Sequence, residues 1–442
     1  MRKTKYALIG SGPAALFAAE AIRQRDSHGE IVMIGAEGYL PYYRPLTSYY
    51  LGRLVSKERL FLREKEYFRQ QNIEFIEGIV TAVKGQEKLL FYQPLCSKNK
   101  ENNKGPKSPG EEDAAGVHLP IRFEKLLIAP GASPVKPDIP GIEAAGVYTL
   151  RTIEDAEKIS AGAKGKQKAL LLGGGLVSLK AAYALHKLGL KTTLVVSSRR
   201  ILSQMLDEKG ASLVADVLEE NGLEILLGRD AMAIEDDDGI KRVTLNDGGE
   251  LKADLVIVGK GVKPATSFLQ GSGIAVENGL PVDKLLQTNL PDIYGAGDAI
   301  LCRDLLLTRQ VNNALWPNAT EQGSIAGANM SGEELPYRGS MRMNATEFFG
   351  LPVIAAGLVA VQEKTEKSKE NGLEFYEVQS PRYGKNKNRR YLKLVFQEDR
   401  LVGYIAIGEN RKAGMLTSLI TSCRPLSPQR KQRLINGNLA YF

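Results

Sequence analysis

Two glycines near the start of the chain have the spacing of a dinucleotide-binding loop. Gly10 and Gly12 follow an apolar run, and Ala15 completes the pattern Gly-x-Gly-x-x-Ala. The first glycine permits a tight turn, the second lets the backbone reach a pyrophosphate, and the small third residue lets helix and strand pack closely. The pyrophosphate would lie on the helix N-terminus, where N–H groups and the dipole favour negative charge. Glu37 follows the strand predicted at 31–34, where an acid is expected to bind ribose hydroxyls.

A second loop of the same kind, the glycine run 173–175, predicts a second dinucleotide site. The end of the strand that follows discriminates between the two nicotinamide cofactors, because an acid there would repel a 2′-phosphate. This chain has Val196 at that position, followed by two serines and by Arg199 and Arg200. Hydroxyl and guanidinium groups suit a phosphate. We therefore expect NADPH rather than NADH, with a solvated arginine pair as the alternative.

Both loops join a β-type apolar run to an alanine-rich helical pattern. The strands are predicted at 6–9 and 169–172, and the helices at 16–25 and 179–188. A repeated strand–loop–helix unit is typical of α/β proteins with parallel sheets. At 442 residues the chain has room for about three domains.

Composition excludes several classes of protein. The three cysteines and three histidines are scattered, which argues against a disulfide-stapled secreted domain, an iron–sulfur cluster and a metal centre. The net charge of +8 is spread along the chain, so an acidic protein is at least as good a partner as nucleic acid. We see no signal peptide and no apolar run that could cross a membrane, and expect a cytoplasmic protein.

Four further blocks resemble the flavin-dependent pyridine nucleotide–disulfide oxidoreductases, in the branch of ferredoxin and rubredoxin reductases, NADH oxidases and nitrite reductase flavoproteins. They are 35–48, 125–132, 288–299 and 316–323, in the family's order. The resemblance implies FAD on the first site and the nicotinamide dinucleotide on the second. The FAD residues it implies are Gly10, Gly12, Pro13, Ala14, Ala15, Glu37, Arg44, Pro45, Val80, Ala129, Pro130, Gly131, Gly297, Asp298, Trp316 and Ala319. Those for the nicotinamide dinucleotide are Gly173, Gly174, Gly175, Leu176, Val177, Ser178, Ser197, Arg199, Arg200 and Gly261.

The same resemblance implies an α/β fold with two Rossmann-like domains of the glutathione-reductase type and a C-terminal α+β interface domain. We expect a discontinuous FAD domain at 1–120 and 287–335, an NAD(P) domain at 146–286, and an interface domain at 336–442. A homodimer is expected. The polar stretch 97–116 predicts a surface loop, and the basic run 385–390 predicts a hairpin turn more than a docking patch.

The chain departs from the family where relatives carry a redox-active cysteine, since Ser48 stands there. A serine hydroxyl cannot form the stable thiolate that disulfide exchange uses. We expect packing roles for Cys96 and Cys302. Ferredoxin-reductase relatives carry a lysine at the Ser48 position and an acid where this chain has Lys180. We hypothesise that Lys180 supplies the cation near the flavin, the alternative being a solvent-facing lysine. The candidate catalytic residues are Lys180, Ser48 and Trp316.

The expected function is that of an FAD-dependent NAD(P)H oxidoreductase whose electrons leave the flavin without a disulfide. An electron-carrier protein such as ferredoxin or rubredoxin is the favoured acceptor, because such carriers are commonly acidic. The alternatives are an NAD(P)H oxidase that uses oxygen, and a flavoprotein electron-entry subunit of a larger redox complex.

Overall fold

The computed structural model describes residues 1–95, 118–359, 372–378 and 389–437. The loop predicted at 97–116, Cys96 and most of the basic run 385–390 lie outside these residues. The chain divides into two compact units. The first unit contains residues 1–46, 55–133 and 262–340, and the second contains 47–54, 134–261 and 341–442.

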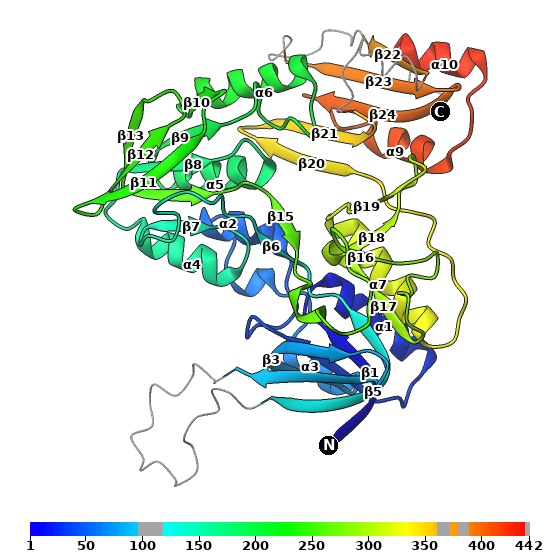
Figure 1. The fold of residues 1–442 in the computed structure, drawn as a ribbon. Helices are drawn as coiled ribbons and strands as arrows, with labels where there is room; N and C mark the ends of the chain where they lie inside the picture. Colours follow the sequence, from blue (N-terminus) through cyan, green and yellow to red (C-terminus); the bar gives the residue numbers. More distant parts are fainter. Residues whose placement is uncertain (96–117, 360–371, 379–388, 438–442) are drawn as a thin grey trace. The chain divides into compact units, whose positions relative to one another are not determined.

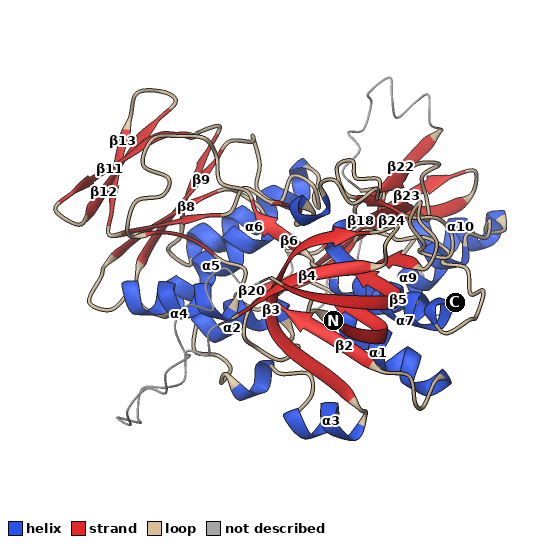
Figure 2. Cartoon of the chain, turned by 60° about the horizontal axis from the view of Figure 1, so that its bottom comes forward, coloured by secondary structure: helices blue, strands red, loops and turns tan. Residues whose placement is uncertain are grey.

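The first unit is built on a sheet in which β1 lies between β2 and β5, all parallel, with β3 beside β2 and β17 beside β5 (Figure 2). Strand β4 runs antiparallel to both β3 and β5. The sheet strands are β1 (Arg2–Ile9), β2 (Ile31–Gly35), β3 (Ile73–Lys84), β4 (Leu89–Pro94), β5 (Leu119–Ile128) and β17 (Ile293–Gly295). The shorter strands are β6 (Ala132–Pro134), β15 (Val262–Pro264), β16 (Leu280–Pro281), β18 (Ile300–Arg303) and β19 (Gln310–Val311).

Two long helices of the first unit, α1 (Pro13–Arg25) and α7 (Trp316–Met330), lie side by side (Figure 1). Their backbones approach closely at two glycines of α7. A Cβ at Gly323 would lie 2.2 Å from the Ala14 carbonyl oxygen, and one at Gly327 would lie 2.4 Å from that of Ala18. The remaining helices of this unit are short, namely η1 (Arg44–Leu46), η2 (Glu58–Leu60), α3 (Lys65–Gln70), η3 (Ser267–Leu269) and η4 (Gly297–Ala299).

The second unit contains an all-parallel sheet in the order β10-β9-β8-β14-β7. Its strands are β7 (Val147–Thr149), β8 (Lys168–Leu172), β9 (Lys191–Val196), β10 (Glu224–Leu227) and β14 (Leu255–Val258), and an antiparallel sheet is formed by β11 (Ala231–Asp237), β12 (Ile240–Leu245) and β13 (Glu250–Ala253). The helices that accompany them are α2 (Thr47–Leu51), α4 (Ile153–Gly162), α5 (Leu176–Lys187) and α6 (Glu208–Glu220).

The C-terminal part of the second unit is an antiparallel sheet with helices packed on it. Its order is β20-β21-β24-β23-β22. The elements are β20 (Met343–Phe348), β21 (Leu351–Gly357), β22 (Leu373–Val378), β23 (Tyr391–Gln397), β24 (Arg400–Ile407), α9 (Ala413–Ser422) and α10 (Pro428–Ile435). The predicted α/β class is confirmed, with one mixed and one all-parallel sheet of the nucleotide-binding type.

The two compact units do not follow the expected domain boundaries. Residues 262–286, expected in the NAD(P) domain, group with the first unit. The reason is packing, because Leu269, Ile274 and Leu280 are buried in the core of that unit. The second unit holds the other parallel sheet together with the C-terminal sheet.

Candidate functional site

The first glycine loop joins β1 to α1 and is built for close backbone approach. Gly10 has a φ of +110°, and a Cβ there would lie 2.1 Å from the carbonyl oxygen of Ala129, so only glycine fits. At Gly12, by contrast, a Cβ would meet no protein atom within 4 Å. Gly12 is the N-cap of α1, and Pro13 is its first residue. The loop therefore leaves open space in front of a helix N-terminus, beside the packed residues Ala14 and Ala15.

The turn after β5 faces the same loop. The N–H of Ala129 donates to the Ile9 carbonyl at 2.9 Å, and Gly131, after Pro130, has a φ of +77°. These contacts bring Ala129, Pro130 and Gly131 to the first glycine loop. Val80, on β3, is buried in the core of the unit instead.

Glu37, two residues beyond β2, is held by two neighbours. Its carboxylate accepts from the Arg44 guanidinium at 2.6 Å and from the Tyr42 hydroxyl at 2.5 Å. Burial alone would lower the pKa of Arg44, but the charges of Glu37, Tyr42 and Asp298 raise it. Each carboxylate oxygen has two lone pairs, so Glu37 can accept from ribose hydroxyls while it stays paired with Arg44. Pro45 continues the short helix η1 behind Arg44.

The second flavin block meets the first loop. Gly297 has a φ of +80°, and a Cβ there would lie 3.3 Å from the Ala14 Cβ and 3.8 Å from the Ala319 Cβ. Asp298 follows it in η4. Trp316 opens α7, and its ring makes an edge contact with Tyr43 at 4.4 Å between centroids. The structure therefore brings together, within one compact unit, the FAD residues predicted from four separate blocks.

The second glycine loop lies between β8 and α5 and has the same backbone features as the first loop. Gly173 has a φ of +130°, and a Cβ there would lie 2.3 Å from the Gly259 carbonyl oxygen. Gly175 is the N-cap of α5 and, like Gly12, has open space around it. The Ser178 hydroxyl donates to the Gly259 carbonyl at 3.2 Å and closes the loop. Leu176 is half-buried and Val177 exposed at the helix start, and Gly261 has open space as well.

The residues that follow β9, beside this loop, differ in burial and in hydrogen bonding. Val196 is buried. It packs so closely against Gly174 that a Cβ at Gly174 would lie 2.5 Å from its side chain. The Arg200 guanidinium donates to the carbonyls of Leu206 and Ser203, at 3.1 and 3.4 Å, so it is engaged in holding its own loop. Ser197 and Arg199 are exposed, and Arg199 contacts no charged or polar partner in the part of the chain that the structure describes.

Ser48 and Lys180 both belong to the second unit, on the neighbouring helices α2 and α5. Ser48 is buried, and its carbonyl accepts from the N–H of Gly52 at 3.1 Å. The Lys180 ammonium lies 5.7 Å from the ring centroid of Tyr49. Burial lowers the pKa of Lys180. The structure thus places the lysine beside the helix that carries the serine.

The two glycine-capped helix starts fit anionic ligands. Neither α1 nor α5 receives a hydrogen bond from a capping side chain. In α4, α6 and α10 that function is served by Thr152, Asp207 and Ser427. Helices α3, α7 and α9 also have no side-chain cap, but their N-caps are Glu64, Leu315 and Lys412 and not a glycine facing open space. Free N–H groups with open space in front of them suit the pyrophosphates of FAD and NAD(P)H.

Comparison with known proteins decides the family. Residues 4–323 match the family described as pyridine nucleotide-disulphide oxidoreductase. The chain belongs to this family. It is accordingly an FAD-dependent NAD(P)H oxidoreductase.

Individual relatives of this oxidoreductase cover most of its length. It is 31% identical, over 98% of the chain and 95% of the relative, to the NADH-dependent phenylglyoxylate dehydrogenase subunit epsilon of Aromatoleum evansii. It is 29% identical to the assimilatory nitrate reductase electron transfer subunit of Bacillus subtilis, where 98% of the chain spans 51% of the relative. A solved NAD-dependent persulfide reductase from A. fulgidus aligns with a TM-score of 0.83 at 28% identity, over 95% of this chain and 77% of that one. Its relatives include both carrier-protein reductases and subunits of larger redox complexes.

The described cysteines of the oxidoreductase are unpaired. Cys302 is buried, and its Sγ lies 3.6 Å from the Ser340 hydroxyl and 3.6 Å from Nε2 of Gln322. Burial raises the pKa of the Cys302 thiol. The sequence did not reveal that Cys302 contacts Gln322, a residue of the flavin block 316–323. No local signal distinguished Gln322, because the same helix also carries the polar residues Asn318, Thr320 and Asn329.

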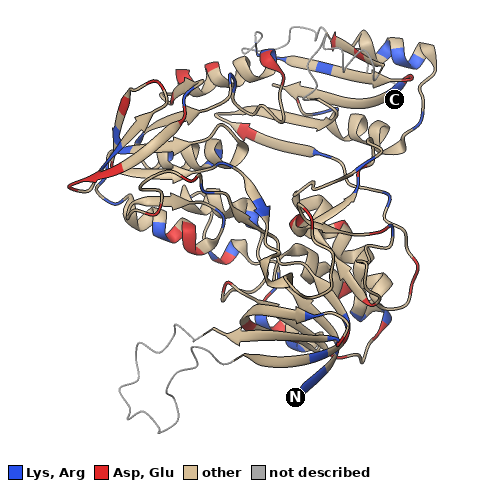
Figure 3. Ribbon diagram, in the orientation of Figure 1, with Lys and Arg blue, Asp and Glu red and all other residues tan. Residues whose placement is uncertain are grey.

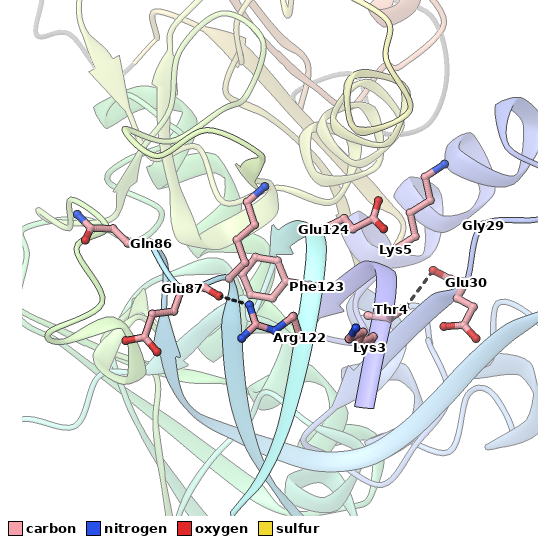
Figure 4. A pocket seen from close by; sticks show the side chains of 11 residues that line it. Lys3, Thr4, Lys5, Gly29, Glu30, Gln86, Glu87, Arg122, Phe123 and Glu124 are labelled. Carbon is pink, nitrogen blue, oxygen red and sulfur yellow. Dashed lines mark hydrogen bonds between the residues drawn. The ribbon is translucent and has the colours of Figure 1, made fainter. Parts of the chain in front are cut away.

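A surface pocket of the oxidoreductase lies at the start of β1, the opposite end of that strand from Gly10 (Figure 4). Its lining mixes charges, and Lys5 and Lys88 are paired with Asp26 and Asp292. We therefore assign it no part in cofactor binding. In the described ranges no cluster of His, Cys, Asp and Glu could hold a metal ion, and no helix has the length and apolar character to cross a membrane.

Proposed function

We propose that this chain passes electrons from NAD(P)H through FAD to a protein acceptor of the ferredoxin or rubredoxin type. The observation that carries the proposal is the combination of two glycine loops open to dinucleotides with a buried hydroxyl, Ser48, where thiol-dependent relatives use cysteine. A serine cannot relay electrons through a disulfide.

When bound, FAD takes up the hydride of NAD(P)H and passes its electrons on. The chain's part is positioning and electrostatics. We propose that Gly12 and the start of α1 hold the FAD pyrophosphate, that Glu37 holds a ribose, and that Asp298 contacts the ribityl chain. Trp316 and Ala319 would lie against the ring system, and the loop 173–175 would hold the nicotinamide dinucleotide.

Charge supports an acidic acceptor. From residue 411 to the C-terminus the chain has six basic residues and no acid. Figure 3 shows Lys and Arg on α10. Of these residues Arg411, Arg424, Arg430 and Arg433 are exposed. An acidic carrier would be steered by such a surface at low ionic strength.

The test is anaerobic reduction of the purified flavoprotein by NADH or NADPH, followed by addition of a [2Fe–2S] ferredoxin, a rubredoxin or dioxygen. We expect rapid reoxidation by at least one carrier, slowed by added salt, and slow reoxidation by dioxygen. Fast turnover with dioxygen alone would support the oxidase alternative. Failure of both nucleotides to bleach the flavin would contradict the oxidoreductase function itself.

The second candidate, an electron-entry subunit of a larger complex, is favoured by the match over nearly full length to a dehydrogenase subunit. Affinity purification of the chain from its native host distinguishes the two. Stoichiometric co-purification of iron–sulfur subunits supports the subunit function, whereas a fully active isolated protein supports a free reductase. We also propose a cytoplasmic homodimer, which light scattering on the purified protein tests.

We further propose that Lys180 supplies the positive charge beside the flavin. Support comes from the α2–α5 pairing, in which Lys180 lies over Tyr49, next to Ser48. A cation near the ring system stabilises the negative charge that hydride arrival creates. Lys180→Met is therefore expected to slow flavin reduction by about 10- to 100-fold and to lower the flavin midpoint potential.

The matched control is Lys187→Met. Lys187 also lies on α5 and also stands over an aromatic ring, 5.4 Å from the centroid of Tyr183. We expect this variant to keep the wild-type reduction rate and potential in stopped-flow and redox titration. Equal rates for the Lys180 variant and the wild type would refute the proposed role.

The preference for NADPH is also a proposal. It is supported by Val196 at the discriminating position and by the exposed Arg199, which has no partner among the described residues. Arg199→Ala is expected to raise KM for NADPH about tenfold, because a guanidinium–phosphate contact is lost. KM for NADH should change less than about twofold, since NADH carries no 2′-phosphate. Arg200→Ala should raise KM for both, because Arg200 holds the loop carbonyls. Better use of NADH than of NADPH by the wild type would overturn the proposal.

A further inference from the structure

The turn that carries Asp298 is held from behind by a side chain of α7. Gly297, in the left-handed region at a φ of +80°, donates its N–H to Oε1 of Gln322 at 2.9 Å. Gln322 is buried, with 2% of its surface exposed. Gly297 itself is half-buried, but its N–H faces this buried amide, so leaving that N–H without an acceptor has a high cost.

The far end of the Gln322 amide fixes its orientation. Nε2 lies 3.3 Å from the Tyr337 hydroxyl and 3.6 Å from the Cys302 Sγ. Since an amide nitrogen only donates, and the Gly297 N–H also only donates, Oε1 must face Gly297. Reversing the amide would set two donors against each other at Gly297.

The partners behind Gln322 are neutral. Burial raises the pKa of the Cys302 thiol and the pKa of the Tyr337 phenol, so both keep their protons at neutral pH. Cys302 in turn donates to the Ser340 hydroxyl, which also accepts from Nδ2 of Asn313 at 2.8 Å. All five side chains are buried. A hydrogen-bonded network of buried side chains rigidifies what it supports.

We propose that Gln322 is a positioning residue that fixes the Gly297–Asp298 turn for FAD, with Cys302 and Tyr337 as its support. This rests on the proposed binding of FAD at Asp298 and goes beyond it, since Gln322 acts from the buried side of the turn. The same assignment gives Cys302 a role as hydrogen-bond partner, in place of the inert packing expected for it.

Gln322→Leu tests the proposal without any turnover. In the apoprotein, we expect amide hydrogen exchange in a peptide covering 296–299 to become at least about tenfold faster, because the Gly297 N–H has lost its acceptor. On titration with FAD, the dissociation constant should rise about tenfold, which is the effect of losing one hydrogen bond that fixes the turn. Gln322→Glu keeps an oxygen acceptor for Gly297 and should restore binding to within about threefold.

Asn329→Leu is the matched control. Asn329 lies on α7, is buried, and bonds the backbone of Leu285 and Leu335 at 2.7 to 2.9 Å, away from Gly297. It should lower thermal stability as much as Gln322→Leu does, yet leave FAD affinity and exchange at 296–299 near wild type.

The outcomes separate the two proposals. If the wild type binds no FAD, the proposed function fails whatever Gln322 does. If the wild type binds FAD and Gln322→Leu binds it equally well with unchanged exchange at 296–299, only the positioning role is overturned. Should Gln322→Leu not fold, Gln322→Glu decides, since a more than tenfold loss of FAD affinity in a folded Glu variant with slow exchange at Gly297 contradicts the role.

Discussion

Replacing Gly12 with alanine is expected to weaken FAD binding strongly while the apoprotein keeps its fold. A Cβ at Gly12 meets no protein atom within 4 Å, and the φ of −86° suits alanine. The fold therefore loses less than about 1 kcal/mol, the usual difference between glycine and alanine at an N-cap. A methyl group pressed against the pyrophosphate should cost about 1–3 kcal/mol of binding, or about 10- to 100-fold in affinity.

Gly175→Ala makes the same change at the second loop, where the surrounding space is equally open. It should leave FAD content unchanged and raise KM for the nicotinamide dinucleotide. Flavin content by absorbance, thermal melting of the apoproteins and steady-state KM measure the two effects. Gly414→Ala, on α9 with open space around it, serves as control and should change none of them. A loss of apoprotein stability well above about 1 kcal/mol in Gly12→Ala would contradict the assignment, because no protein atom lies close enough to clash with the added methyl group.

An ion pair between Lys393 and Asp207 is expected to contribute strongly to the stability of the second unit. Lys393 on β23 is 1% exposed, and its ammonium lies 2.9 Å from a carboxylate oxygen of Asp207, the N-cap of α6. Asp207 also accepts from the Tyr391 hydroxyl at 2.6 Å and from the Gly210 N–H at 2.9 Å. Lys393→Met is expected to lower the free energy of unfolding by about 3 kcal/mol, because it breaks an ion pair at a buried ammonium and leaves the half-buried Asp207 carboxylate without its counter-charge.

Chemical denaturation of Lys393→Met, of Asp207→Asn and of the double variant checks this result. The double variant should recover most of the loss, since neither charge then remains alone. Lys209→Met is the matched control, because Lys209 is exposed and pairs with the exposed Glu377, and such pairs contribute little. A Lys393→Met variant as stable as the wild type would contradict the prediction.

The same carboxylate predicts a dependence of stability on pH. Burial would raise the pKa of Asp207, but its hydrogen bonds from Tyr391 and Gly210 and its pairing with Lys393 lower it in the folded protein. The unfolded chain therefore takes up the proton first as the pH falls. The stabilisation is complete above the unfolded pKa of about 3.9 and is lost as the pH falls through the lower folded value. In Asp207→Asn, the free energy of unfolding measured by chemical denaturation should therefore fall less steeply with decreasing pH.

The sequence predicted those parts of the fold in which the backbone conformation requires a particular residue type. Gly10 and Gly173 mark turns in which a Cβ would strike a carbonyl, and their sequence context predicted the strand and helix on either side. The family resemblance was predictable for the same reason, because its blocks are local. Membership of the pyridine nucleotide-disulphide oxidoreductases is confirmed.

Contacts between distant residues were not predictable. Nothing near Arg200 in the sequence shows that its guanidinium is engaged by the carbonyls of Ser203 and Leu206 while that of Arg199 is exposed. The contact of Cys302 with Gln322 spans 20 positions. Such contacts depend on how loops pack, and no local pattern of residue types encodes that packing.

The two glycines at the α1–α7 contact also set the distance between the starts of these helices. Helix α1 starts at the first glycine loop, and α7 starts at Trp316. Because Gly323 and Gly327 bring the main chains of these helices into contact with no side chain between them, the separation of the two helix starts is a property of the backbone. Drift in side-chain size elsewhere in the core cannot alter it. Most mutations therefore leave unchanged the distance that an extended ligand must bridge between the two helix starts. That distance depends on Gly323 and Gly327, which no larger residue can replace.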